Sequence, residues 1–174
     1  MPHFFKNAPD AFVLGYRAED LLALLSCAYR VMLVSRGEKV IVSVFNPDEV
    51  RHGFYSDRMV LQISAPDGPF YVTSVRERLR AMGLSVVHLI HPILPVSWDA
   101  RGRLADIGSA RLPGRQSLIH VELERVEDRA MPDRIEREVR RVFADIELVV
   151  RDFARMRSVV ETLRRELETA EDGS

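Results

Sequence analysis

The most regular hydrophobic pattern lies at the C-terminal end of the chain, where apolar residues are separated alternately by four and three positions. No Pro or Gly interrupts the chain between Asp133 and Asp172. This spacing predicts one helix of about 50 Å with a heptad stripe along one side. The stripe comprises Ile135, Val139, Val142, Ile146, Val149, Phe153, Met156, Val160, Leu163 and Leu167. Because such a helix is longer than a small domain is wide, we expect its far half to pack on another chain or domain, or to break into a helical hairpin.

Shorter alternating patterns predict four strands upstream of this helix. In the last of them, Ile119, Val121 and Leu123 share one face, while His120 and Glu122 point to the other. The sequence DARG that follows the third strand is typical of a hairpin turn. The predicted strands cover residues 39–45, 59–64, 84–96 and 117–126, and the turn covers residues 99–102.

Two further segments have helical patterns, and the order of elements indicates the fold class. The first helix is expected over 18–35 with Gly37 as its C-terminal cap, and the second from Pro69 to about Met82. Helices that return between antiparallel strands favour an α+β fold. We therefore predict a ferredoxin-like, four-stranded antiparallel sheet with helices on one face and a long C-terminal helix, and with the strand at 39–45 at its edge.

Length, charge and cysteine content narrow the functional classes. The chain has 174 residues, a net charge of -1 and one cysteine, Cys27, in an apolar helical stretch. These values favour one globular domain over a nucleic-acid-binding protein, and a buried thiol over a nucleophile. The apolar run 21–34 contains Arg30 and is too short to cross a membrane. Since this run follows acidic residues rather than a basic segment, we expect no signal peptide and a cytoplasmic protein.

Two histidines, His88 and His91, stand in the apolar segment 84–96. Residues three apart on a strand point to opposite faces, so the pair cannot bind one ion unless a bulge intervenes. We expect His91 in the core, hydrogen-bonded to the backbone, and His88 outside it. If the strands pair, His120 and Glu122 lie beside His88, either as an exposed polar sheet face or as metal ligands. We favour the first alternative and predict no metal site.

Patterns of the common catalytic classes are missing from the sequence. No serine stands in a glycine-rich elbow, and neither a GxGxxG motif nor a phosphate loop occurs. We therefore predict no catalytic residue and no cofactor in this chain. A glycine-bearing loop over 99–116 holds four arginines, which either receive an anion or acidic partner or are simply solvated. These are Arg101, Arg103, Arg111 and Arg115.

The most site-like feature is the predicted turn from strand to helix, APDGPFYVTS at 65–74. Such turns expose backbone N–H groups, and the helix N-terminus that follows attracts carboxylates. Asp67, Gly68 and Ser74 are accordingly our candidates for binding an amino-acid ligand. The alternative is that Gly68 and Pro69 only form a tight connection.

Three stretches of the chain occur together in the order and spacing of one protein family. They resemble the N-terminal region of the large-type, NAD-specific glutamate dehydrogenases of bacteria, which is similar to an ACT-type regulatory module. One difference is that Thr73 stands where the family usually has an aspartate, so a ligand role of that carboxylate does not carry over to this chain. The stretches are FNPDEVRHGFYSDRMVLQI at 45–63, DGPFYVTSVRERLRAMGLSVVHLIHPILPVSWDARGRL at 67–104 and QSLIHVELER at 116–125.

The resemblance implies a division of the chain and a function. It implies an N-terminal extension with a helix and edge strand at 1–57, an ACT-like core at 58–131 and a helical arm at 132–174. The parent enzymes oxidise glutamate to 2-oxoglutarate and ammonia with NAD, and this region precedes their catalytic part. We therefore expect a non-catalytic regulatory module whose partners are the remainder of the dehydrogenase or other copies of itself, with an amino-acid effector. A structural or oligomerisation module without ligand, and less favoured still a small stand-alone enzyme, are the alternatives.

Overall fold

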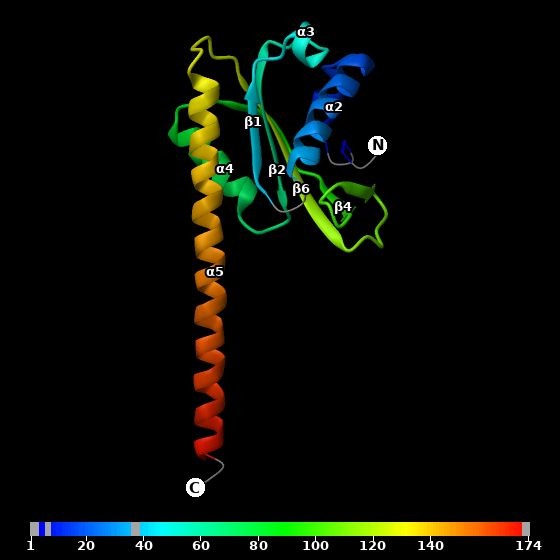
Figure 1. The fold of residues 1–174 in the computed structure, drawn as a ribbon. Coiled ribbons are helices and arrows are strands. Elements are labelled where there is room, and N and C mark those ends of the chain that lie inside the picture. Colours follow the sequence, from blue (N-terminus) through cyan, green and yellow to red (C-terminus); the bar gives the residue numbers. More distant parts are fainter. Residues whose placement is uncertain (1–3, 6–7, 36–38, 172–174) are drawn as a thin grey trace.

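The computed structural model describes residues 4–5, 8–35 and 39–171, with the side chains at 154, 158, 163 and 165–171 left out (Figure 1). The expected helix cap Gly37 lies outside the described residues. The helices are α1 (Asp10–Leu14), α2 (Ala18–Ser35), α3 (Glu49–His52), α4 (Tyr71–Ala81) and α5 (Met131–Glu171). The strands are β1 (Ile41–Phe45), β2 (Arg58–Pro66), β3 (Val86–Ile90), β4 (Ile93–Trp98), β5 (Leu104–Ile107) and β6 (Gly114–Glu124).

The six strands form one antiparallel sheet in the order β1-β2-β6-β4-β5, with β3 also paired to β6. The α+β class, the antiparallel sheet, the edge position of β1 and the long C-terminal helix are as predicted. The strand count differs, since the sequence predicted four strands. The long strands β2 and β6 pair with each other over their length at the centre of the sheet.

The difference in strand count has two physical causes. The segment predicted as one strand divides at Pro92, which has no N–H to donate to the sheet. Both halves still run along β6, because Ile90 pairs with His120 and Ile93 with Ser117. The sixth strand, β5, pairs with β4 across the predicted hairpin turn. Its side chains are mostly exposed, so it lacks the alternating pattern that marks the other strands.

Helices cover both faces of the sheet, whereas the sequence predicted helices on one face (Figure 1). α4 and the first half of α5 pack on the face formed by residues such as Leu61 and Val121. On the opposite face α2 covers β1 and β2, so that Val60 and Gln62 are buried as well. The prediction was wrong on this point because that second face carries polar residues, which we had assigned to solvent.

α5 is a continuous helix of 41 residues, about 60 Å long, and extends far beyond the sheet (Figure 1). The predicted stripe is buried at its start, from Ile135 to Ile146. Farther along it is exposed at Val149, Phe153, Met156 and Val160. The side chains of Leu163 and Leu167 lie outside the described ones. The helix therefore outruns its domain as expected, without breaking into a hairpin. Among the described residues, no helix has the length and apolar character needed to cross a membrane.

Candidate functional site

The turn between β2 and α4 is attached to the sheet through Asp67. Its Oδ1 atom accepts a hydrogen bond of 2.6 Å from the Ser117 hydroxyl, and its backbone N–H donates to the Arg115 carbonyl at 3.0 Å. His91 Nε2 lies 3.1 Å from the same Ser117 oxygen. Because that hydroxyl already donates to a carboxylate, it accepts the N–H of His91. A connected row of carboxylate, hydroxyl and imidazole thus lies at the end of β6.

Burial lowers the pKa of His91, while the nearby Asp67 carboxylate acts in the opposite direction. His91 is half-buried on the α4 side of the sheet, as expected for the core phase, but its partner is a side chain rather than the backbone. The neutral form of the His91 imidazole is therefore favoured, and its Nε2–H donates to the Ser117 hydroxyl oxygen.

Gly68 occupies a position of close approach. A Cβ atom there would lie 2.6 Å from the Tyr71 hydroxyl oxygen, so any larger residue displaces that ring. The Tyr71 ring itself lies against Phe143 of α5, with 4.6 Å between ring centroids. Gly68 therefore allows the first residue of α4 to fold back over the turn, and this geometry favours a packing role for the glycine.

Ser74 lies in a different place from Asp67. It lines an open groove of about 470 Å³ between α4 and α5, together with Phe70, Arg78 and Val149 among others. Asp67 is not part of that lining. The three residues singled out in the sequence therefore share one turn and helix start, but Asp67 faces the end of the sheet and Ser74 faces α5.

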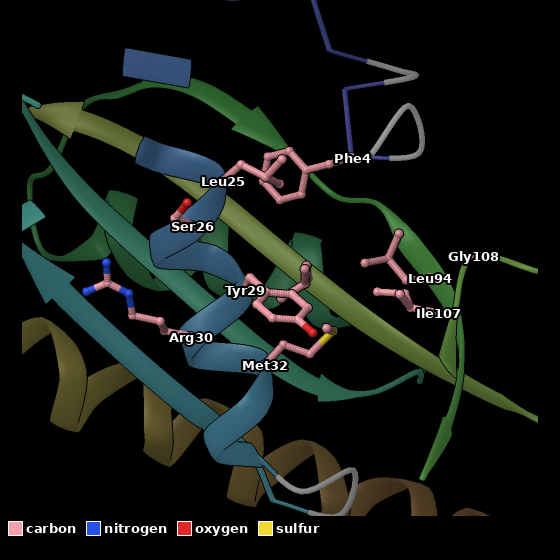
Figure 2. A pocket seen from close by; sticks show the side chains of 10 residues that line it. Phe4, Leu25, Ser26, Tyr29, Arg30, Met32, Leu94, Ile107 and Gly108 are labelled. Atoms are coloured by element: carbon pink, nitrogen blue, oxygen red, sulfur yellow. The ribbon is translucent and has the colours of Figure 1, made fainter. Parts of the chain in front are cut away.

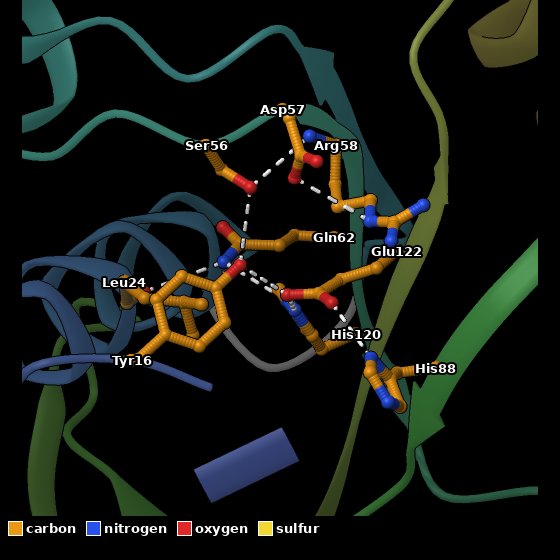
Figure 3. Close-up of polar contacts among 9 residues, drawn as sticks. All are labelled: Tyr16, Leu24, Ser56, Asp57, Arg58, Gln62, His88, His120 and Glu122. Atoms are coloured by element: carbon orange, nitrogen blue, oxygen red, sulfur yellow. Dashed lines mark hydrogen bonds and ion pairs between the residues drawn. The ribbon is translucent and has the colours of Figure 1, made fainter. Parts of the chain in front are cut away.

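A second polar cluster is buried beneath α1 and α2 (Figure 3). The sequence predicted that His88, His120 and Glu122 lie side by side, but it missed their burial and the contact with Tyr16. At its centre is Glu122, whose side chain is 2% exposed. Its carboxylate accepts hydrogen bonds from the Tyr16 hydroxyl and from His88 Nδ1, the latter at 2.9 Å. His120 Nε2 lies 3.7 Å from the same carboxylate. Among the residues that the structure describes, no Arg or Lys pairs with this carboxylate. A carboxylate held by a phenol and two imidazoles is an uncommon way to bury a charge.

The ionisation of this cluster follows from its contacts. Burial alone would raise the pKa of Glu122, but the neighbouring His120 and the hydrogen bonds from Tyr16 and His88 hold that pKa below its ordinary value. Burial and the same carboxylate raise the pKa of Tyr16, which therefore stays protonated. Glu122 is thus the charged acceptor and Tyr16 a permanent donor.

The cluster corrects the expectation that His120 and Glu122 are exposed to solvent. His120 and Glu122 were predicted on an exposed sheet face, and they are buried because the aromatic N-terminal segment covers them: Phe12 lies edge-on to both His88 and His120. His88 and His91 do lie on opposite faces, as predicted. In the described part of the chain, no group of three or more His, Cys, Asp or Glu side chains is arranged to hold a metal ion.

Three of the other candidate residues, Cys27, Arg103 and Arg115, have structural roles. Cys27 is buried, and burial raises the pKa of its thiol, as expected of an unreactive cysteine. In the loop 99–116, Arg103 pairs with Asp99 and Arg115 donates to three backbone carbonyls of its own loop. These two arginines stabilise the loop.

Comparisons with known proteins give the chain its family. The NAD-specific glutamate dehydrogenase of Pseudomonas aeruginosa is 29% identical over 146 residues, and that of Halomonas elongata is 30% identical over 170 residues. These matches cover 82% and 95% of this chain but only 9% and 10% of those proteins, so the chain spans about a tenth of their length. No solved structure matches the chain. Residues 1–139 match the family described as "Glutamate dehydrogenase, ACT1 domain". The chain belongs to this family of glutamate dehydrogenase ACT1 domains.

Proposed function

We propose that this chain is a non-catalytic regulatory module of an NAD-dependent glutamate dehydrogenase, an enzyme that oxidises L-glutamate to 2-oxoglutarate and ammonia. The observation that carries the proposal is the family match over residues 1–139. In this proposal NAD binds elsewhere in the enzyme, and the partner of the module is the remainder of the dehydrogenase.

The regulatory signal that we propose is an amino acid bound at the turn formed by β2 and the start of α4. Asp67 supplies a carboxylate for an ammonium group, and the Ser117 hydroxyl, itself bonded to His91, fixes the carboxylate in place. Gly68 leaves room beside it for the Tyr71 ring, and Ser74 supplies a hydroxyl one helical turn further on. Because Asp67 and Ser74 face different ways, the ligand in this proposal reaches across the first turn of α4.

Thermal unfolding of the purified chain with each of the twenty amino acids, 2-oxoglutarate and nucleotides tests this proposal. A ligand at 100 times its dissociation constant stabilises the chain by about 2.7 kcal/mol, which raises the melting temperature by several degrees. We expect one amino acid to produce the shift and Asp67→Ala or Ser74→Ala to abolish it. If both variants bind like the parent, the turn is not the site.

A second function, assembly without a ligand, is supported by the exposed part of the α5 stripe. Phe153 is 61% exposed and Met156 60%, in register with the buried residues of the same helix. An amphipathic helix of this kind normally covers its apolar side against another element. In this alternative, α5 joins the module to the remainder of the enzyme or to another copy.

A further inference from the structure

A cavity of about 440 Å³ lies on the α2 side of the sheet (Figure 2). It is separate from the β2–α4 turn but borders the Glu122 cluster, because Phe4 of its lining lies edge-on to His120. It is enclosed by α2, by the β4–β5 hairpin and by Phe4 of the N-terminal segment. Its lining includes Met32, Leu94, Ile107 and Leu118. The volume is in the range of small-molecule sites, which are commonly apolar with few polar groups.

The cavity exists because α2 covers only part of this face. α2 packs on β1 and β2, whereas the hairpin lies at the opposite side of the sheet. Between them the sheet surface is apolar, with Leu94 and Leu118 buried, and no helix of the described residues fills the space above it. The gap thus follows from the positions of α2 and the β4–β5 hairpin.

The uncharged polar side chains that line the cavity are those of Ser26 and Tyr29. Arg30 contributes to the lining, but Figure 2 shows its guanidinium on the other side of α2 from Tyr29. The Ser26 hydroxyl already donates to the Leu22 carbonyl at 2.8 Å. The Tyr29 hydroxyl makes no hydrogen bond to any residue that the structure describes. One hydrogen-bonding group in an apolar site is therefore unoccupied.

We propose that this cavity binds a neutral, mostly apolar small molecule that carries one hydrogen-bonding group, which pairs with the Tyr29 hydroxyl. A charged ligand is disfavoured because it would lose its hydration without a countercharge from the lining. A free amino acid, with two charged groups, therefore does not fit. This site is independent of the effector site proposed at the β2–α4 turn, which lies on another part of the domain.

The test uses 4-ethylphenol and ethylbenzene as probes of the same shape, with and without a hydroxyl. Methyl NMR spectra of the 19.9 kDa chain are recorded during titration to millimolar concentration. We expect shifts of the Met32, Leu94, Ile107 and Leu118 methyl signals while those of Val149 and Val160 on α5 stay in place. No shift, or shifts at the α5 methyls alone, would overturn the proposal.

Variants decide whether the probes bind in the cavity and whether the Tyr29 hydroxyl contributes to their binding. Tyr29→Phe should weaken the binding of 4-ethylphenol about two- to tenfold and leave the affinity for ethylbenzene unchanged. Equal effects on both probes would overturn the role of the hydroxyl. Ser26→Trp should fill the cavity and abolish binding of both, whereas Leu22→Trp, an exposed site on the same helix outside the cavity, should not. Ile107→Trp at the hairpin is a second filling variant if Ser26→Trp does not fold, and retained binding in a folded filling variant would refute the site.

Discussion

Asp67 and Ser117 are 50 positions apart in the sequence, yet the Ser117 hydroxyl donates a 2.6 Å hydrogen bond to the Asp67 carboxylate. The bond connects the β2–α4 turn to the strand at the centre of the sheet. Ser117 is fully buried, so its oxygen has a fixed position from which the turn is held. A residue that resembles a free ligand-binding carboxylate in the sequence is thus also an anchor of the turn.

Asp67→Ala should lower the free energy of unfolding even without any ligand. The substitution removes the acceptor of a buried hydroxyl, which costs about 1 kcal/mol. Urea denaturation measures the loss, and Asp145→Ala, an exposed helical aspartate, should show none. Equal stability of Asp67→Ala and the parent would show that the bond contributes nothing in solution.

The chain should become less stable as the pH falls below about 6.5. Burial lowers the pKa of His91 below its ordinary 6.5, so in this range the unfolded chain binds a proton that the folded chain does not. The free energy of unfolding therefore rises with pH between the pKa of His91 in the folded chain and about 6.5. The contribution of His91 is lost as the pH falls through this range. Unfolding midpoints at several pH values should show a shallower loss for His91→Gln, and an unchanged slope would exclude His91 as a source.

The sequence predicted the α4 face of the sheet well because most residues that alternate onto it are apolar, as in Ile119, Val121 and Leu123. The opposite face was assigned to solvent because it carries Gln62, His120 and Glu122. These residues are buried by contacts with Tyr16 and Leu24, which lie far away in the sequence. Alternation shows which residues share a face, but only the tertiary fold determines whether that face meets water or a helix.

The candidate site shows the same limit. The turn at 65–74 was recognisable from its own residues, since Asp67, Gly68 and Pro69 are typical of turns. Ser117 and His91 were not, because nothing local distinguishes a serine that meets Asp67 from any other strand serine. One sign that this face is covered was available in the sequence. The N-terminal segment is rich in aromatic residues, which tend to pack against the body of the domain, and Phe12 packs on His88 and His120.

Tyr16→Phe should destabilise the chain by about 1–3 kcal/mol, because it removes a donor from the buried Glu122 carboxylate. Tyr55→Phe is the matched control, since Tyr55 is 61% exposed. Chemical denaturation of both variants gives the comparison. Similar stabilities for the two would mean that water replaces the Tyr16 hydroxyl at no cost.

A new charge should strongly destabilise the chain in the first half of α5 and have little effect on stability in the second half. Ile146→Glu places a carboxylate against the domain and should cost about 3 kcal/mol or more. Val149→Glu and Met156→Glu, on the exposed half of the same stripe, should change the free energy of unfolding by no more than about 0.5 kcal/mol.

The exposed variants also test assembly through α5. If the stripe pairs with another copy, light scattering should show a lower mass for Val149→Glu and Met156→Glu than for the parent. An unchanged mass would count against pairing with another copy and would leave the remainder of the dehydrogenase as the partner in this proposal.

Replacing Phe70 with glycine should stabilise the chain by about 1 kcal/mol. Phe70 precedes α4 with φ of 70°, a left-handed conformation that is unfavourable for any residue with a Cβ atom, and its ring is 62% exposed. Phe70→Ala keeps the Cβ atom and should not share the gain, so the two variants separate backbone strain from exposure of the ring. Melting temperatures provide the measurement, and an equal rise for both would assign the effect to the ring. Because the ring borders the α4–α5 groove, a groove partner that contacts Phe70 should bind the glycine variant more weakly.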